Sequence, residues 1–226
     1  MILSMISISV SRKGFFVSPL LFWVLLASCL FCFSCRTIPR GDVPFIEGIV
    51  PERASPSVML MGRGSRNAGE LAAFFAAHAG SRTSAIVPEQ ELIERAARLA
   101  PLYVEECLVE GVNWDVAFVQ MCLETGYLGF GGLVTPEMNN FCGLGAIGPE
   151  QPGLSFPDER TGVRAHVQHL KAYGSAEPLQ GESVDPRYKY VQPKGKAPDV
   201  FGLAGTWAAD REYGVKLASL LERLGS

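Results

Sequence analysis

Apolar residues recur every three or four positions in several stretches between residue 67 and the C-terminus, and this helical spacing limits the folds open to the chain. In "NAGELAAFFAAHAG", Asn67 is a candidate N-cap and Gly80 a candidate stop, which predicts a short amphipathic helix. Further helices are predicted to begin at or near Pro88, Asn113, Gly162 and Asp210. Strand signals are few and short. The sequence therefore predicts a mainly helical fold with a small irregular or β lobe.

Pro101 lies inside the longest helical pattern. A proline in a helix interior removes one backbone hydrogen bond and clashes with the preceding turn. We therefore expect this helix to be kinked or split at Pro101. The stretch from Glu150 to Thr161 is rich in glycine, proline and acidic residues, which predicts an irregular loop or a short hairpin.

Residues 1–35 resemble an export leader, because Arg12 and Lys13 precede a long uncharged apolar run. The run also approaches the about 20 apolar residues that a membrane-spanning helix needs, so an uncleaved anchor is the alternative. The sequence "LASC", which ends at Cys29, resembles the lipobox of bacterial lipoproteins, in which the cysteine is lipidated. Cys35 is a weaker second candidate. We expect an exported lipoprotein, anchored to a membrane in the periplasm or cell envelope.

The rest of the chain divides into a linker and a domain. Residues 36–64 are rich in proline, glycine, arginine and serine without a sustained period, which is typical of a flexible linker. Residues 65–226 suit one domain of ordinary size. The chain has 20 Lys+Arg against 23 Asp+Glu and a formal net charge of −3. This balance argues against nucleic acid as a partner.

Neither the cysteines nor the histidines of the domain form a recognised metal-binding pattern. The cysteines of the domain are Cys107, Cys122 and Cys142. Their spacing matches no zinc motif, and their odd number allows at most one internal disulfide, whose pairing stays open. His166 and His169 share one helical face, but no H-E-x-x-H motif accompanies them. We expect buried thiols, packed histidines and no metal or other cofactor.

The stretch "QMCLETGYLGFGG", residues 120–132, places Glu124 at the end of an apolar helix and before four glycines. Ala117, Met121 and Leu128 recur on the same helical face as this carboxylate, which predicts that it points inward. Because burying a lone carboxylate is costly, such a group finds a partner or keeps its proton near neutral pH, as a general acid must. The alternative is a glutamate that lies at the rim of the helix or pairs with an arginine. The glycines allow a tight exit and close approach of a ligand.

Several separated motifs occur in an order that resembles the glucosaminidase domain of glycoside hydrolase family 73, which comprises bacterial peptidoglycan hydrolases. They are "AFVQMCLETGYLGFGG", "NNFCGLGA", "GVRAHVQHLKAY", "VDPRY" and "LAGTWAADREYGVKL". The resemblance runs from about Ser65 to the C-terminus. It implies a lysozyme-like α+β fold, predominantly helical with a small irregular or β lobe, and a carbohydrate cleft between the two. It also implies endo-β-N-acetylglucosaminidase activity on the β-1,4 bonds of glycan strands.

The resemblance also implies roles for individual residues. The family's acidic residue, the general acid, falls on Glu124. The residues expected to bind the glycan are Tyr127, Asn139, Asn140, Phe141, Trp207 and Tyr213. Aromatic rings suit the apolar faces of sugars, asparagine amides suit hydroxyl and N-acetyl groups, and a protonated carboxyl can deliver a proton to the leaving oxygen. The alternative for Trp207 and Tyr213 is an ordinary place in the core.

The second catalytic group stays open. The segment between "NNFCGLGA" and "GVRAHVQHL" is short, so the lobe that carries a second acid in some relatives is reduced here. The acids available there are Glu150, Asp158 and Glu159. Assistance by the 2-acetamido group of the substrate needs no protein nucleophile. We expect a peptidoglycan hydrolase; the alternatives are a lysozyme-fold lipoprotein that binds glycan or an assembly partner without cleaving it, and a lytic transglycosylase.

Overall fold

A computed structural model describes residues 57–80 and 88–226. The predicted leader, both candidate lipidation cysteines and most of the predicted linker lie outside the described residues. The chain divides into two units, Met1–Ile49 and Val50–Ser226, and every described residue belongs to the second. None of the helices in the described residues is long and apolar enough to cross a membrane.

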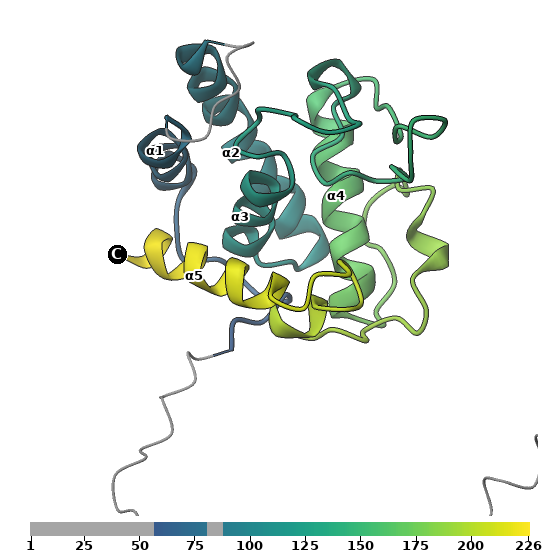
Figure 1. The fold of residues 1–226 in the computed structure, drawn as a ribbon. Coiled ribbons are helices and arrows are strands. Elements are labelled where there is room, and N and C mark those ends of the chain that lie inside the picture. The colour runs from purple at the N-terminus through teal and green to yellow at the C-terminus, as the bar shows by residue number, and fades with distance from the viewer. Residues whose placement is uncertain (1–56, 81–87) are drawn as a thin grey trace, which may run out of the picture. The chain divides into compact units, whose positions relative to one another are not determined.

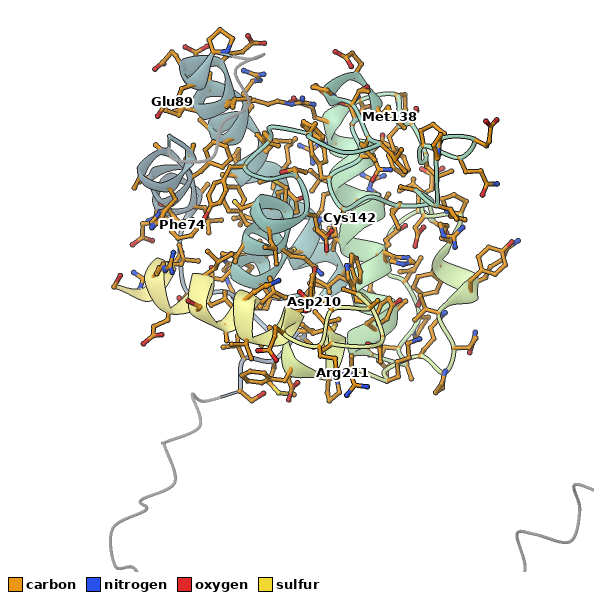
Figure 2. All side chains as sticks on the ribbon, viewed as in Figure 1. Phe74, Glu89, Met138, Cys142, Asp210 and Arg211 are labelled. Carbon is orange, nitrogen blue, oxygen red and sulfur yellow. The ribbon has the colours of Figure 1, made fainter. Side chains whose placement is uncertain are left out.

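The second unit is built from helices joined by irregular segments (Figure 1). Its α-helices are α1 (Ala68–Ala79), α2 (Glu89–Glu110), α3 (Trp114–Glu124), α4 (Glu159–Gly174) and α5 (Tyr213–Gly225), and its short 3-10 helices are η2 (Pro136–Met138), η3 (Tyr188–Tyr190) and η4 (Phe201–Leu203). Helix α3 contacts each of the other α-helices. Side chains fill the space around it (Figure 2), and its residues from Trp114 to Cys122 are all buried. Helix α3 is therefore the centre of the fold.

The predicted N-caps position these helices. Asn67 accepts a hydrogen bond from the backbone of Glu70, whose side chain in turn accepts from the backbone of Asn67, so α1 begins with a capping box. Asn113 accepts from the backbone of Asp115 at the start of α3. Asp158, which was not predicted as an N-cap, caps α4 in the same way. Each such cap stabilises its helix by about 1 kcal/mol. The helix starts predicted at Asn67 and Asn113 are confirmed.

Of the two outcomes expected at Pro101, the split is wrong, because α2 runs without interruption through this residue, and the kink stays a prediction. Its neighbours Ala100 and Tyr103 are fully buried, and α2 packs against α1, α3 and α4. Packing along a helix of 22 residues offsets the one backbone hydrogen bond that proline removes. The tertiary contacts thus outweigh the local penalty.

The described end of the predicted linker, residues 57–64, packs against the helical domain. Leu60 is fully buried, its N–H donates to the carbonyl of Pro198, and its own carbonyl accepts from the N–H of Asn113. Isolated β-bridges join Met59 to Asp199 and Met61 to Val112. These contacts bring the chain into the domain ahead of α1.

The predominantly helical character of the fold is confirmed, and it is consistent with a lysozyme-like glucosaminidase domain. The segment from 125 to 158, called the lobe below, is irregular apart from η2. Within the described residues, β-structure is limited to isolated bridges, such as the bridge between Gly148 and Gln151, so the expected β part of the lobe is not confirmed. The lobe has a small apolar cluster of its own, which contains Cys142, Leu144 and Phe156 and packs against Ala165 of α4.

Candidate active site

The chain leaves α3 through a turn that holds several residues in the left-handed region. Gly126, Tyr127 and Leu128 have φ angles of 57°, 57° and 60°. Side chains make this region unfavourable, so the two non-glycine residues are strained. Both are buried in the core, and the N–H of Leu128 donates to the hydroxyl of Thr125. Strain that packing maintains is typical of functional sites, and here it lies directly after Glu124.

Glu124 points inward, as its helical spacing predicts. Its Oε1 accepts hydrogen bonds from Nε1 of Trp207, at 2.8 Å, and from the hydroxyl of Tyr213. Within the described residues it pairs with no arginine, and its Oε2 has no hydrogen-bond partner. Burial raises the pKa of Glu124 above its ordinary value, and the hydrogen bonds from Tyr213 and Trp207 oppose this rise. The arrangement favours a carboxyl that holds its proton more tightly than a solvated one.

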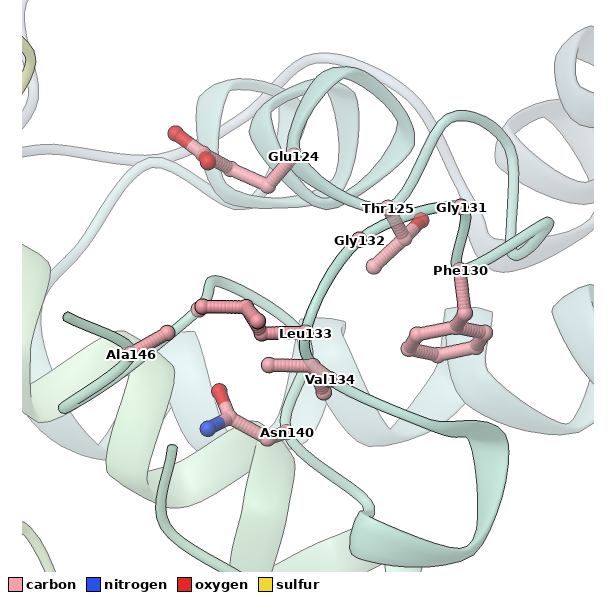
Figure 3. A pocket seen from close by; sticks show the side chains of 10 residues that line it. Glu124, Thr125, Phe130, Gly131, Gly132, Leu133, Val134, Asn140 and Ala146 are labelled. Atoms are coloured by element: carbon pink, nitrogen blue, oxygen red, sulfur yellow. The ribbon is translucent and has the colours of Figure 1, made fainter. Parts of the chain in front are cut away.

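Glu124 borders an open groove with a cavity volume of about 170 Å³ (Figure 3). The residues that line it are Glu124, Thr125, Phe130, Gly131, Gly132, Leu133, Val134, Asn140, Gly143 and Ala146. Figure 3 shows Glu124 at the end of α3, with Asn140 across the groove and Leu133 and Val134 between them. The groove therefore lies between the end of α3 and the lobe.

The predicted residues of the lobe shape the wall opposite Glu124. The Asn140 amide donates to the carbonyls of Leu144 and Leu154 and accepts from the N–H of Leu144, so it ties the lobe together. Asn139 donates to the carbonyl of Phe156. Phe141 is fully buried. Asn140 lines the groove, whereas Asn139 and Phe141 do not.

Arg95 of α2 fastens the lobe to the helices. Its guanidinium donates to Glu159, to the carbonyl of Pro136 and to Oδ1 of Asn139. It also lies over the ring of Phe141, 5.4 Å from the ring centroid. One side chain thus contacts the middle of the lobe and the start of α4.

Besides Phe141, the three other aromatic residues predicted to bind the glycan occupy different places. Trp207 and Tyr213 meet at Glu124, and Trp207 also packs against the ring of His169 with centroids 5.2 Å apart. Tyr127 lies in the core beside Phe75, with centroids 5.5 Å apart. The structure therefore brings two of these aromatic residues to the acid and buries the third.

The three candidate second carboxylates lie away from the groove. Asp158 caps α4, and Glu159 forms an ion pair with Arg95 at 2.9 Å. Glu150 is exposed on the turn that the Gly148–Gln151 bridge closes. None of the three lines the groove. Among the lining residues in the described part of the chain, Glu124 is the one carboxylate.

The three cysteines of the domain are free, buried thiols, and burial raises their pKa values. Within residues 57–80 and 88–226, no three His, Cys, Asp or Glu side chains are grouped so that they could hold a metal ion. His169 donates from Nδ1 to Asp185, at 2.7 Å. His166 lies in a different polar network.

That network extends from Tyr213 into the core and was not predicted from the sequence. Nε2 of Gln120 lies 2.9 Å from the hydroxyl of Tyr213. Nε2 of His166 lies 3.1 Å from Oε1 of Gln120, and the hydroxyl of Tyr103 lies 2.9 Å from Nδ1 of His166. Burial lowers the pKa of His166 to about 3, so its ring is neutral. The available signal was Gln120 itself, a polar residue in an apolar helix one turn before Glu124.

Comparison with known proteins agrees with this geometry. Residues 100–226 match the glucosaminidase family, described as mannosyl-glycoprotein endo-beta-N-acetylglucosaminidase. An uncharacterized protein of Borreliella burgdorferi is 44% identical over 126 residues, which are 56% of this chain and 61% of that relative. The chain therefore spans less than two thirds of the relative's length. No solved structure matches the chain. The family match contains α3, the lobe and both donors to Glu124, and the chain belongs to the glucosaminidase family, glycoside hydrolase family 73.

Proposed function

We propose that the protein is an exported peptidoglycan hydrolase that cleaves the β-1,4 bond after N-acetylglucosamine, with Glu124 as the general acid. Membership of the glucosaminidase family supports a glycoside hydrolase. The observation that carries the proposal is the environment of Glu124. Two donors hold one oxygen of its carboxyl, the other oxygen has no partner within the described residues, and the side chain borders a groove.

The raised pKa of Glu124 suits the first chemical step, because burial keeps part of the population protonated closer to neutral pH. The protonated carboxyl donates to the glycosidic oxygen as the bond to the anomeric carbon breaks. The carboxylate that remains keeps the hydrogen bonds from Trp207 and Tyr213, which stabilise its negative charge. The same two donors thus serve both protonation states.

The second step can follow two routes. None of Glu150, Asp158 and Glu159 lines the groove, so any of them would require a movement that brings it there to act on the substrate. Attack by the 2-acetamido group of the sugar requires no such movement and is compatible with one carboxylate at the groove. The stereochemistry at the new reducing end separates direct inversion by water from a double displacement.

The decisive experiment is digestion of purified peptidoglycan by the detergent-solubilised full-length protein and by Glu124→Gln, with mass analysis of the fragments. We expect reducing N-acetylglucosamine ends that fall by a factor of about 10²–10⁴ in the variant. Anhydro ends would indicate a lytic transglycosylase. Equal release by both proteins would remove Glu124 from the mechanism, and binding without release would favour a glycan-binding lipoprotein.

Export and anchoring are proposed from the leader sequence. Arg12 and Lys13 before an apolar run, followed by "LASC", support lipidation at Cys29. Labelling of cells with palmitate, compared between the natural chain and Cys29→Ala, tests this proposal. Label that persists in Cys29→Ala and disappears in Cys35→Ala would identify Cys35 as the lipidated residue.

A further inference from the structure

Four buried polar side chains from four helices form one hydrogen-bonded chain that ends on Glu124. It begins at Tyr103 on α2, continues through His166 on α4 and Gln120 on α3, and reaches Tyr213 on α5. The first three side chains are fully buried, and Tyr213 is 5% exposed. Buried polar groups are costly unless each is satisfied, so the direction of every bond matters.

The direction follows from what each atom can donate. His166 is neutral and therefore carries one ring proton. Its Nε2 faces Oε1 of Gln120, which can accept and cannot donate, so the proton is on Nε2. Nδ1 of His166 then accepts from the hydroxyl of Tyr103. Gln120 donates to the hydroxyl of Tyr213, and Tyr213 donates to Glu124.

The opposite direction would leave a buried donor unsatisfied. If the amide of Gln120 were turned over, Tyr213 would donate to Gln120, and His166 would donate from Nδ1 to Tyr103. The hydroxyl proton of Tyr103 would then lack an acceptor, because His166 is the hydrogen-bond partner of this hydroxyl within the described residues. A buried donor without an acceptor is destabilising. Tyr103 therefore fixes the direction of the whole chain.

This direction determines where the acidic proton of Glu124 resides. The single hydroxyl proton of Tyr213 points to Oε1, and the indole N–H of Trp207 points to the same atom. Two donors on Oε1 leave Oε2 as the site of protonation. We propose that Tyr103 is a positioning residue which, through His166 and Gln120, keeps the transferable proton of Glu124 on Oε2.

The proposal rests on the proposed function for the destination of that proton. In the transfer, the Oε2–H bond breaks and its electron pair stays on the carboxylate. The proton passes to the glycosidic oxygen, which retains the electron pair of the broken bond to the anomeric carbon. A proton on Oε1 would instead be shared with Tyr213 and would face away from the substrate-accessible oxygen. The position of the proton thus has a large effect on the rate of the chemical step and a small effect on substrate binding.

Few other groups near this chain of hydrogen-bonded side chains can change charge close to neutral pH. The titratable groups that face Glu124 or the chain are Tyr213 from α5, His169 from α4 with its partner Asp185, and the thiols of Cys107, Cys122 and Cys142. Burial raises the pKa values of these thiols and of Tyr213. A shift in the titration of Glu124 therefore reports on the hydrogen-bonded chain, provided that the His169 pair is monitored in parallel.

The test is Tyr103→Phe, which removes one hydroxyl and keeps the ring. Without that hydroxyl, both directions of the chain leave one nitrogen of His166 unpaired, so the reversed direction becomes accessible. The reversed direction requires a proton on Oε1, and the pKa of Glu124 should rise. We expect an upward shift of about one pH unit in the titration of the ¹³C-labelled Glu124 carboxyl carbon, assigned with Glu124→Gln. The alkaline limb of the pH–rate profile should move with it, and kcat should fall while KM stays unchanged.

The control is Tyr188→Phe, which removes the hydroxyl of a half-buried tyrosine that donates to the carbonyl of Glu177, outside the hydrogen-bonded chain. It should leave the pKa of Glu124 unchanged. Equal shifts in Tyr103→Phe and Tyr188→Phe, or no shift in Tyr103→Phe, would overturn the proposal.

A second variant, Gln120→Met, removes the alternative acceptor of Tyr213. The hydroxyl of Tyr213 then has Glu124 as its remaining acceptor, so the pKa of Glu124 should stay within about half a unit of that in the natural protein. Adding Gln120→Met to Tyr103→Phe should cancel the upward shift. A rise of a full unit in Gln120→Met alone would overturn the proposal, even if Tyr103→Phe failed to fold. Because the NMR titration needs no substrate, a protein that shows these shifts and cleaves no peptidoglycan would refute the proposed function and leave the position of the proton intact.

Discussion

The two walls of the groove are held in place by different kinds of interaction. Helix α3, which carries Glu124, is almost entirely buried and contacts each of the other α-helices. The lobe, which carries Asn140, is held by amide and guanidinium hydrogen bonds to backbone carbonyls and by a small apolar cluster. One wall depends on apolar packing spread over many side chains, whereas the other depends on a few polar residues.

This difference separates two tasks of the site. Apolar packing around α3 removes water from Glu124 and raises its pKa, so in the proposed mechanism the helical wall sets the chemistry. The lobe sets the shape of the groove and can loosen without unfolding the helices, since regions with few apolar contacts open at lower free energy. Substitutions in the two walls should therefore have effects of different kinds as well as different sizes.

The largest effect is expected in the helical wall. Phe118 of α3 is fully buried and packs edge-on against Tyr103, with ring centroids 5.7 Å apart. Phe118→Ala should lower the free energy of unfolding by about 3–5 kcal/mol, because it removes a large apolar side chain and leaves a cavity. Denaturant unfolding followed by tryptophan fluorescence and by far-UV circular dichroism should give one shifted transition. Two separate transitions would contradict the view that α3 is the centre of a single cooperative unit.

An intermediate and local effect is expected in the lobe. Arg95→Met removes the donors to Glu159, Pro136 and Asn139, all of which are half-buried. We expect a loss of about 2–4 kcal/mol in the stability of the lobe. Hydrogen exchange should become faster in residues 130–158 and stay slow in α3.

The matched control is Arg98→Met. Arg98 is 59% exposed and lies 3.8 Å from Glu159, so its removal should change stability by less than about 1 kcal/mol. If Arg95→Met accelerated exchange equally in α3, the two walls would form one unit, and the distinction between them would fail.

The helical wall was largely predictable from the sequence because its signals are local. The N-caps at Asn67 and Asn113 and the inward direction of Glu124 follow from residues within one or two turns of each. The uninterrupted helix through Pro101 was not predictable in the same way, because it depends on packing against three other helices. Local propensity gives a weak expectation that tertiary contacts can override.

The lobe and the polar chain could be predicted only in part. The sequence places Asn139 and Asn140 beside the acid by resemblance, but it gives no sign that Arg95, from a distant helix, holds this segment. The bond between Tyr103 and His166 joins residues 63 positions apart, and the bond between His166 and Gln120 spans 46. Such pairs have no periodicity that a single sequence could reveal.

The smallest expected effect compares the pH dependence of two carboxyl groups, one at the end of α3 and one at the end of the lobe. Burial raises the pKa of Glu124, so its contribution to stability is fully present below the ordinary glutamate pKa of about 4.3 and is lost as pH rises through the higher folded value. Asp158 ends the lobe and caps α4, and the backbone N–H of Thr161 lowers its pKa. Its contribution has the opposite sign: it is present above the ordinary aspartate pKa of about 3.9 and is lost as pH falls.

Two variants turn this contrast into a measurement of unfolding free energy between pH 3 and pH 7. Relative to the natural protein, Glu124→Gln should gain stability as pH rises, because the natural chain must either bury a charge or keep its proton. Asp158→Asn should instead lose stability as pH rises, by less than about 1 kcal/mol, since asparagine is also a good N-cap. Parallel curves for the two variants would mean that Glu124 is solvated like a surface carboxylate, and the helical wall would then lose its assigned part in the chemistry.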